Sequence, residues 1–342
     1  MNFDTGGRED VWRQDDVDEG CIGAGFWEAC STADASDRGT RRASRAAGRN
    51  MRDYIELTKP RITWLILMST GIGYFFGVAG AAGWVEFLRH VGVLRLLHTM
   101  LGTGLIASGT AALNQWFERD ADRKMRRTAD RPLPSGRLAS APALAFGAAL
   151  SVAGFLDLWL AVNPLAACIG AFTLASYLFL YTPLKQRTWW STTIGAIPGA
   201  MPPVIGYAAA AGHLTADSWV LFAILFLWQF PHFYSIAWMY KDDYARAGIR
   251  MLPVVEPDGR STARQIVLYG MALIPVSLVP GMLGMSGRIY LAGALLLGLW
   301  FLYAGVRVAR DRTLARARSV LLTSVVYLPF LYGLMLLDRP GL

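Results

Sequence analysis

Long apolar runs separated by short polar segments dominate the chain from about residue 51 onward. Each run approaches the ~20 residues that a helix needs to cross a bilayer. Helices are the expected form, because a helix satisfies its own backbone polar groups in lipid. The pattern predicts an all-α polytopic membrane protein with about nine spanning helices. We place them at residues 62–82, 94–117, 140–161, 164–181, 189–211, 217–239, 265–285, 288–307 and 317–337.

Composition supports this interpretation and excludes two kinds of site. Of the 342 residues, 54% are hydrophobic and 17% are charged, whereas soluble domains carry about 25% charged residues. The three cysteines, Cys21, Cys30 and Cys168, have no spacing typical of metal ligands or redox pairs. We therefore expect neither a disulfide framework nor a zinc site.

The net charge of +8 could indicate nucleic-acid binding, but its distribution argues against it. With the N-terminus on the cytoplasmic side, the opposite side keeps only four basic residues, Arg89, Arg95, Arg288 and Arg339. Such an asymmetry is the positive-inside rule of membrane proteins. We expect a multi-pass protein of the bacterial inner membrane, with the N-terminus and the longer loops in the cytoplasm and no nucleic-acid partner.

Residues 1–50 differ from the rest of the chain. They are polar, acidic at first and Arg-rich later, without the apolar core of a secretory signal. We predict a disordered polar tail, and a true start at Met51 remains an alternative. Residues 51–342 form one predicted transmembrane domain.

A dense charged cassette, NQWFERDADRKMRRTADRPLPSGR, follows the second apolar run at residues 114–137. Asn114, Glu118 and Asp122 are four residues apart and would share one helix face. Hard divalent cations such as Mg²⁺ prefer oxygen ligands and often bind carboxylates together with substrate phosphates. The alternative is a set of solvated ion pairs. Basic residues that could neutralise a diphosphate follow the acids: Arg123, Lys124, Arg127 and Arg131.

A second acidic segment, Lys241-Asp242-Asp243-Tyr244, follows the sixth apolar run. Adjacent acids cannot share a helix face, so periodicity leaves open whether Asp242 or Asp243 faces a site. Lys185, between the fourth and fifth runs, could reach a phosphate or could simply anchor the loop.

His232 lies inside the sixth apolar run, within QFPHFYSIAW. An ionisable side chain within the membrane indicates function by default, although hydrogen-bonded packing is the commoner role of a lone histidine. Tyr181 is one of several aromatic residues that could line a cavity or serve as interfacial anchors.

With these residues in view, the chain resembles the membrane-embedded prenyltransferases of the UbiA superfamily, and within it the haem-modifying branch. The resemblance extends from about Tyr54 to Leu337. It rests on four segments: YIELTKPRI at 54–62, NQWFERDADRKMRRTADRPLPSG at 114–136, YTPLKQRTWWSTTIGAIPGAMPPVIGY at 181–207 and WQFPHFYSIAWMYKDDYARAGIRMLPVV at 228–255.

The resemblance implies nine helices around a central cavity and a farnesyl group passed from farnesyl diphosphate to haem b. Haem b would be a substrate, and Mg²⁺ the cofactor. The catalytic residues would be Asn114, Glu118, Asp122 and Asp243, with Asp242 as a further metal ligand and Arg123, Lys124, Arg127, Arg131 and Lys185 as diphosphate ligands. His232 and Tyr181 would belong to the haem pocket.

The second motif departs from the superfamily pattern DxxxD, because Tyr240 and Tyr244 take its outer positions. This leaves the role of Asp242 and Asp243 less defined than that of the first motif. Implied partners are membrane lipid and, for the product, haem A synthase or proteins that assemble terminal oxidases.

Two alternatives remain from the sequence. The first is a prenyltransferase that acts on 4-hydroxybenzoate or another quinone precursor. The second is an ion-coupled transporter, although transporters commonly bind near the bilayer midplane, whereas these acids lie at one end of the apolar runs.

Overall fold

The computed structural model describes residues 51–78 and 92–339, and all regular secondary structure in those ranges is helical. The predicted tail at 1–50 and the predicted end of the first span at 79–82 lie outside the described residues. Residues 51–57 form a short helix. The remaining elements are α2 (Pro60–Gly77), α4 (Val93–Asp122), α5 (Ser140–Ala161), α6 (Pro164–Ala175), η1 (Ser176–Tyr181), α7 (Thr182–Leu184), α8 (Ser191–Gly199), α9 (Pro202–Ala211), α10 (Ala216–Met239), α11 (Lys241–Arg246), α12 (Leu252–Val255), α13 (Arg260–Met282), α14 (Arg288–Arg310) and α15 (Leu314–Leu337).

Within the described ranges, eight helical segments are long and apolar enough to cross a membrane. They correspond to eight of the nine predicted spans, so the chain is a membrane protein with an all-α fold. The remaining prediction, the first span at 62–82, corresponds to α2, which has 18 residues in the described range and carries the charged Arg61 in its first turn.

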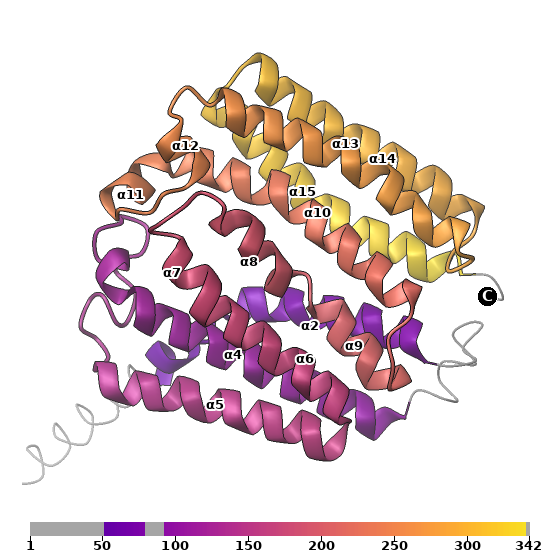
Figure 1. Ribbon diagram of the computed structural model, residues 1–342, viewed down its shortest axis with the longest axis horizontal. Coiled ribbons are helices and arrows are strands. Elements are labelled where there is room, and N and C mark those ends of the chain that lie inside the picture. The colour runs from indigo at the N-terminus through magenta and orange to yellow at the C-terminus, as the bar shows by residue number, and fades with distance from the viewer. Residues whose placement is uncertain (1–50, 79–91, 340–342) are drawn as a thin grey trace, which may run out of the picture. The chain divides into compact units, whose positions relative to one another are not determined.

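The helices pack largely in sequence order (Figure 1). α4 lies along α5, α13 lies along α14, and α10 packs against both α13 and α15. α2 packs against α9, although more than 120 residues separate them in the chain. The largest apolar core joins α2, α8, α9 and α10 to α13, α14 and α15.

The fifth predicted span is not one helix but two, α8 and α9, with a break at Ala200 and Met201. Pro202 and Pro203 cause the break because they lack the N–H groups that would continue the helical bonding. Gln229 of α10 packs beside the break and donates to the Ala196 carbonyl at 3.2 Å. An interrupted helix at membrane depth needs such partners, since lipid supplies none.

Two glycines allow α2 and α9 to touch backbone to backbone. A Cβ on Gly73 would lie 1.8 Å from the Pro203 carbonyl oxygen, and one on Gly206 would lie 1.9 Å from the Thr70 carbonyl oxygen. Small residues at membrane helix interfaces permit this close approach. Backbone contact therefore adds to the apolar side-chain packing between the two helices.

Replacing Gly73 with Val should destabilise the protein by about 3 kcal/mol or more, because the new side chain meets backbone that cannot move aside. Thermal unfolding in detergent, followed by size-exclusion chromatography, measures the change. Gly333→Val is the matched control, since a Cβ at Gly333 meets nothing within 4 Å. Equal melting temperatures for the two variants would contradict the close contact.

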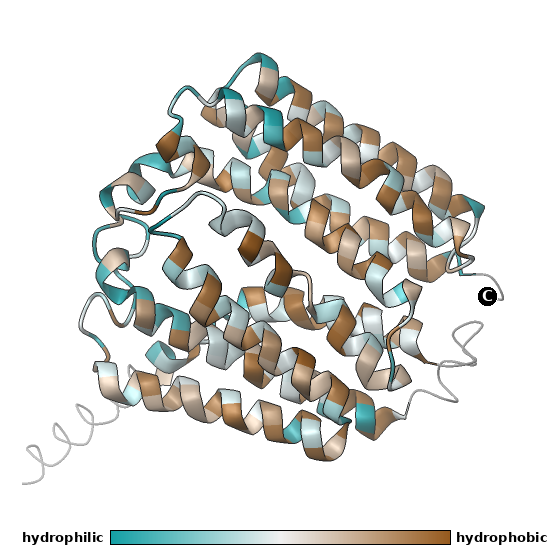
Figure 2. Ribbon diagram, in the orientation of Figure 1, coloured by the Kyte–Doolittle hydropathy of each residue, from teal (hydrophilic) through white to brown (hydrophobic). Residues whose placement is uncertain are grey.

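Hydrophilic residues gather at one end of the helices. Figure 2 shows apolar residues along the helix lengths and hydrophilic ones around α11, α12 and the loop after α4. The C-terminal part of this loop is joined to the short helix at 51–57, because Arg137 pairs with Asp53 at 2.6 Å and with Glu56 at 3.0 Å. The candidate site lies at this end.

Candidate active site

The last three turns of α4 carry the first acidic motif. α4 runs on to Asp122, past the predicted end of the apolar span at 117, so Asn114, Glu118 and Asp122 belong to one continuous helix. Asn114 and Asp122 are buried, with 2% and 1% of their surface exposed. Polar groups so deeply buried require partners, and each of the three has one.

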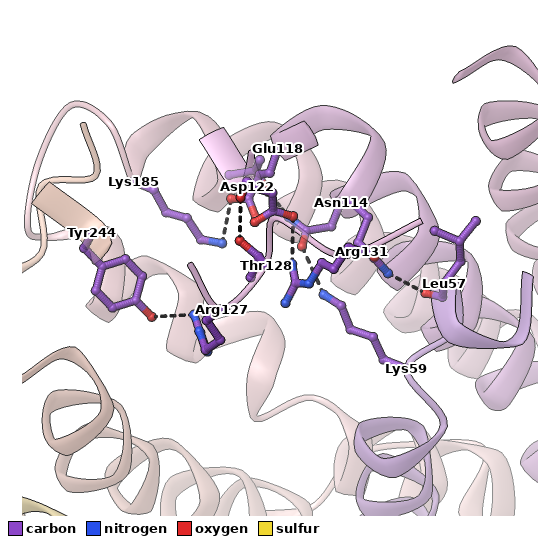
Figure 3. A network of polar contacts seen from close by, with 12 residues as sticks. Leu57, Lys59, Asn114, Glu118, Asp122, Arg127, Thr128, Arg131, Lys185 and Tyr244 are labelled. Atoms are coloured by element: carbon purple, nitrogen blue, oxygen red, sulfur yellow. Dashed lines mark hydrogen bonds and ion pairs between the residues drawn. The ribbon is translucent and has the colours of Figure 1, made fainter. Parts of the chain in front are cut away.

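Glu118 pairs with Lys185, whose Nζ lies 2.7 Å from Oε1 (Figure 3). Lys185 follows α7, so the pair joins the ends of α4 and α7. Burial alone would lower the pKa of Lys185, but the Glu118 carboxylate raises it well above its usual value. Lys185 is therefore held as a cation in a site shielded from water.

Asp122 pairs with Arg131, whose Nη1 lies 2.7 Å from Oδ2. The Thr128 hydroxyl donates to the Asp122 backbone carbonyl at 2.8 Å and holds the following loop against the helix end. Asn114 donates to the Thr182 hydroxyl at 3.2 Å. Each side chain of the motif is thus oriented by a group from another segment.

Lys59 completes the cluster, and the sequence analysis gave it no role. Its Nζ lies 3.4 Å from Oδ1 of Asn114 (Figure 3). Among the described residues, Lys59 alone combines a side chain with a positive φ, of 48°. That conformation costs of order 1 kcal/mol and precedes Pro60, which opens α2. Burial, together with the positive charge of Arg131, lowers the pKa of Lys59 to about 8.

The other basic residues of the first cassette lie farther out. The Arg123 side chain is exposed and donates to the Pro134 carbonyl at 3.3 Å, which braces the loop. Lys124 is exposed. Of the predicted diphosphate ligands, the structure brings Arg131 and Lys185 to the acids and leaves Arg123 and Lys124 at the surface.

Arg127 instead connects the two acidic loops. Its guanidinium lies 4.8 Å from the ring centre of Tyr240 and 5.8 Å from that of Tyr244. Its Nη2 is also 3.4 Å from the Tyr244 hydroxyl. The tyrosines that replace the outer acids of the superfamily motif therefore bind the first cassette through a cation–π contact.

The two adjacent acids of the second loop have different surroundings. Asp243 is buried and ion-paired with Arg246, whereas Asp242 is exposed. Within the described ranges, no group of three or more His, Cys, Asp or Glu side chains is close enough to hold a metal ion. Glu118, Asp122, Asp242 and Asp243 thus do not form one such group of acids, and their role as metal ligands, with Asn114, stays a prediction.

Tyr181 and His232, both predicted for one pocket, have different partners. Tyr181 packs against Tyr177 at a ring distance of 5.0 Å, and its ring centre is 4.3 Å from Lys185 Nζ. It therefore belongs to the polar cluster. His232 lies on α10 and bonds to Ser324 of α15.

The donor chemistry of the first motif fits a hard divalent cation. An amide oxygen and two carboxylates occupy successive turns of α4, and oxygen ligands of this kind suit Mg²⁺. The motif also stands beside the cations Lys59, Arg131 and Lys185, which is the arrangement that a diphosphate requires.

Comparison with known protein families includes this arrangement of acids and cations in one family match. The sequence matches the UbiA prenyltransferase family over residues 63–330, which is most of the chain and contains the first acidic motif, Lys185 and the second acidic loop.

The chain belongs to the UbiA prenyltransferase family.

Similar UbiA-type proteins in three bacteria carry the name protoheme IX farnesyltransferase. The protein of Solibacter usitatus (strain Ellin6076) is 80% identical over 85% of this chain and all of its own length. The protein of Koribacter versatilis (strain Ellin345) is 47% identical over 84% of this chain and 94% of its own length. That of Salinibacter ruber (strain DSM 13855 / M31) is 45% identical over 84% of this chain and 98% of its own.

Solved structures share the UbiA fold. A digeranylgeranylglyceryl phosphate synthase has a TM-score of 0.68 at 18% identity and covers 85% of this chain and 99% of its own. A UbiA homologue from Archaeoglobus fulgidus bound to GPP and Mg²⁺ has a TM-score of 0.60 at 14% identity, over 83% of this chain and 99% of its own. The all-α UbiA fold expected from the sequence is confirmed.

Proposed function

We propose that the protein transfers a farnesyl group from farnesyl diphosphate to a vinyl group of haem b, with addition of water, to give haem O and diphosphate. The observation that carries this proposal is the buried cluster of acids and cations at one end of the apolar helices. The acceptor is supported by the relatives named protoheme IX farnesyltransferase, one of them 80% identical.

The first motif would hold Mg²⁺ through Asn114, Glu118 and Asp122. When bound, the metal supplies Lewis-acid stabilisation of the leaving diphosphate. Of the second loop, Asp243 is the better candidate for a further ligand, since it is buried while Asp242 is exposed. The A. fulgidus homologue with GPP and Mg²⁺ supports a divalent ion in this fold.

The resting ion pairs explain how the same residues could bind the substrate. Lys185 and Arg131 neutralise Glu118 and Asp122 at 2.7 Å each. If each carboxylate turns to a divalent cation, its partner is released beside the site as a positive charge. Lys185 and Arg131 would then bind the diphosphate oxygens and stabilise the charge that builds on them as the allylic C–O bond breaks.

Aromatic rings next to these cations would face the farnesyl carbon that loses the diphosphate. Tyr177 and Tyr181 flank Lys185, and Tyr181 packs closely on Gly195 of α8. Ring faces stabilise cations through their quadrupoles. The vinyl group of haem b would attack the allylic cation, and water would add to the resulting cation and release a proton.

The remaining proposals from the sequence concern the location of the protein in the membrane, its partners and the transporter alternative. The charge asymmetry supports cytoplasmic placement of the N-terminus and of the polar loops in a bacterial inner membrane. Membrane lipid is the surrounding partner, and haem A synthase or oxidase assembly proteins would receive the product. UbiA membership favours group transfer over ion-coupled transport.

The test supplies purified protein in lipid nanodiscs with farnesyl diphosphate, Mg²⁺ and either haem b or 4-hydroxybenzoate. We expect mass spectrometry to find a hydroxyethylfarnesyl haem, and no prenylated benzoate. Chelation by EDTA should stop the reaction, and added Mg²⁺ should restore it. A prenylated benzoate without modified haem would replace this proposal with the quinone-precursor alternative.

A further inference from the structure

A groove with a volume of about 340 Å³ lies between α14 and α15. The two helices pack side by side (Figure 1). The groove is lined by Trp300 of α14 and by one face of α15, which carries Ala315, Arg318, Ser319, Leu322 and Val326. It therefore follows the seam between the last two helices of the chain.

Most side chains of this groove are apolar, and the large ones are exposed. Leu322 shows 57% of its surface, Trp300 shows 43% and Val326 shows 40%. The opposite face of α15 packs into the protein, where Ala317 and Val320 are completely buried. Both helices are long and apolar enough to cross a membrane. Exposed apolar side chains on a spanning helix face lipid chains, so lipid would occupy this groove.

Arg318 places a positive charge at one end of the apolar groove. It comes four residues after Leu314, the first residue of α15, which is roughly 6 Å along the helix axis. A long basic side chain at this depth can extend to the headgroup level while its stem stays among apolar groups. Asp311 pairs with Arg316 at 3.6 Å, and no carboxylate in the described part of the chain pairs with Arg318. Its guanidinium is therefore available to an external anion.

More positive charge lies beyond this end of the groove. Residues 307–318 contain five arginines and one acid, and the connection between α14 and α15 belongs to this segment. Arg312 of the connection lines a second cavity with Trp238 and Lys241, at the junction of α10 and α11. The basic segment thus lies at the end of the helices that carries the second acidic loop.

We propose that an anionic phospholipid binds between α14 and α15, with its phosphate at Arg318 and an acyl chain along Trp300 and Leu322. The planar guanidinium of arginine suits phosphate oxygens, and basic pockets between spanning helices bind anionic headgroups. The excess of arginine over acid selects a lipid with net negative charge. The bound lipid holds α14 and α15 together beside α10, which packs against α15.

The experiment adds phosphatidylglycerol or phosphatidylcholine, with the same acyl chains, to delipidated protein in detergent. Native mass spectrometry measures the bound lipid, and thermal unfolding measures the stabilisation. We expect phosphatidylglycerol to bind more tightly and to raise the melting temperature more than phosphatidylcholine does. Arg318→Gln should weaken phosphatidylglycerol binding about fivefold and should leave phosphatidylcholine binding unchanged.

Two further variants separate the groove from the general surface charge. Ala315→Phe places a ring in the groove without changing any charge, so it should weaken the binding of both lipids. Arg264→Gln is the matched control, because Arg264 is an exposed residue four positions after the start of α13 and does not line the groove. We expect this variant to bind phosphatidylglycerol as the original protein does.

Several results would overturn the lipid site. Equal binding of the two lipids would exclude recognition of the headgroup, and equal losses in Arg264→Gln and Arg318→Gln would reduce the effect to surface charge. Unchanged binding in Ala315→Phe would exclude the acyl chain from the groove. A dimer that Ala315→Phe dissociates, without dependence on lipid, would assign the groove to a second copy of the chain. None of these measurements requires catalysis, so their outcome is independent of the proposed function.

Discussion

Replacing Glu118 with Gln and Asp122 with Asn together should lower the rate of farnesyl transfer at least about 100-fold. Both changes keep side-chain size and remove the charge that would bind Mg²⁺. They also leave Lys185 and Arg131 without their partners at 2.7 Å. Single-turnover assays with farnesyl diphosphate and haem b measure the rate, and mass spectrometry identifies the product.

Asp120→Asn is the matched control for this experiment. Asp120 is also an aspartate of the last turns of α4, but it is exposed and stands off the face of Asn114 and Asp122. We expect its rate to remain within about twofold of the original, since a surface charge change has a small effect. A double variant that retained full activity would overturn the assignment of the first motif.

Replacing Lys185 with Gln should lower kcat about 100-fold, the second large effect. Lys185 is the buried cation that pairs with Glu118 and lies against the ring of Tyr181. Without it, Glu118 keeps an unpaired charge, and the diphosphate loses a group that stabilises its departure. The haem concentration needed for half-maximal rate should change little, because Lys185 would bind the diphosphate of the farnesyl donor and not the haem.

Arg187→Gln provides the comparison, since Arg187 is an exposed base two residues farther along the same loop. If both variants lost activity equally, the role of Lys185 would reduce to the general charge of the loop. High salt would then mimic the substitution, because it screens exposed charges more than buried ones.

The part of the site that follows from helical spacing could be predicted from the sequence. Asn114, Glu118 and Asp122 are four residues apart, and an uninterrupted α4 places them together. Lys185 was found because its loop lies on the same predicted side of the membrane. Both predictions needed only local periodicity and the distribution of charge.

Other features depend on the breaks between elements. Lys59 reaches Asn114 through a left-handed turn before Pro60, a conformation that no composition pattern indicates. Periodicity could not choose between Asp242 and Asp243, because α10 ends at Met239 and α11 begins at Lys241, so the helical phase is interrupted. The division of one apolar run into α8 and α9 was signalled by Pro202 and Pro203, but average hydropathy is insensitive to it.

The contact of Arg127 with Tyr240 and Tyr244 has a consequence for chimeric proteins. Because the guanidinium belongs to the first loop and both rings belong to the second, the two loops form a single structural unit. A first loop grafted alone, without a basic residue at position 127, would leave both rings without their cation. Only hybrids that exchange residues 123–139 and 240–251 together should retain both the contact and the activity of the parent proteins.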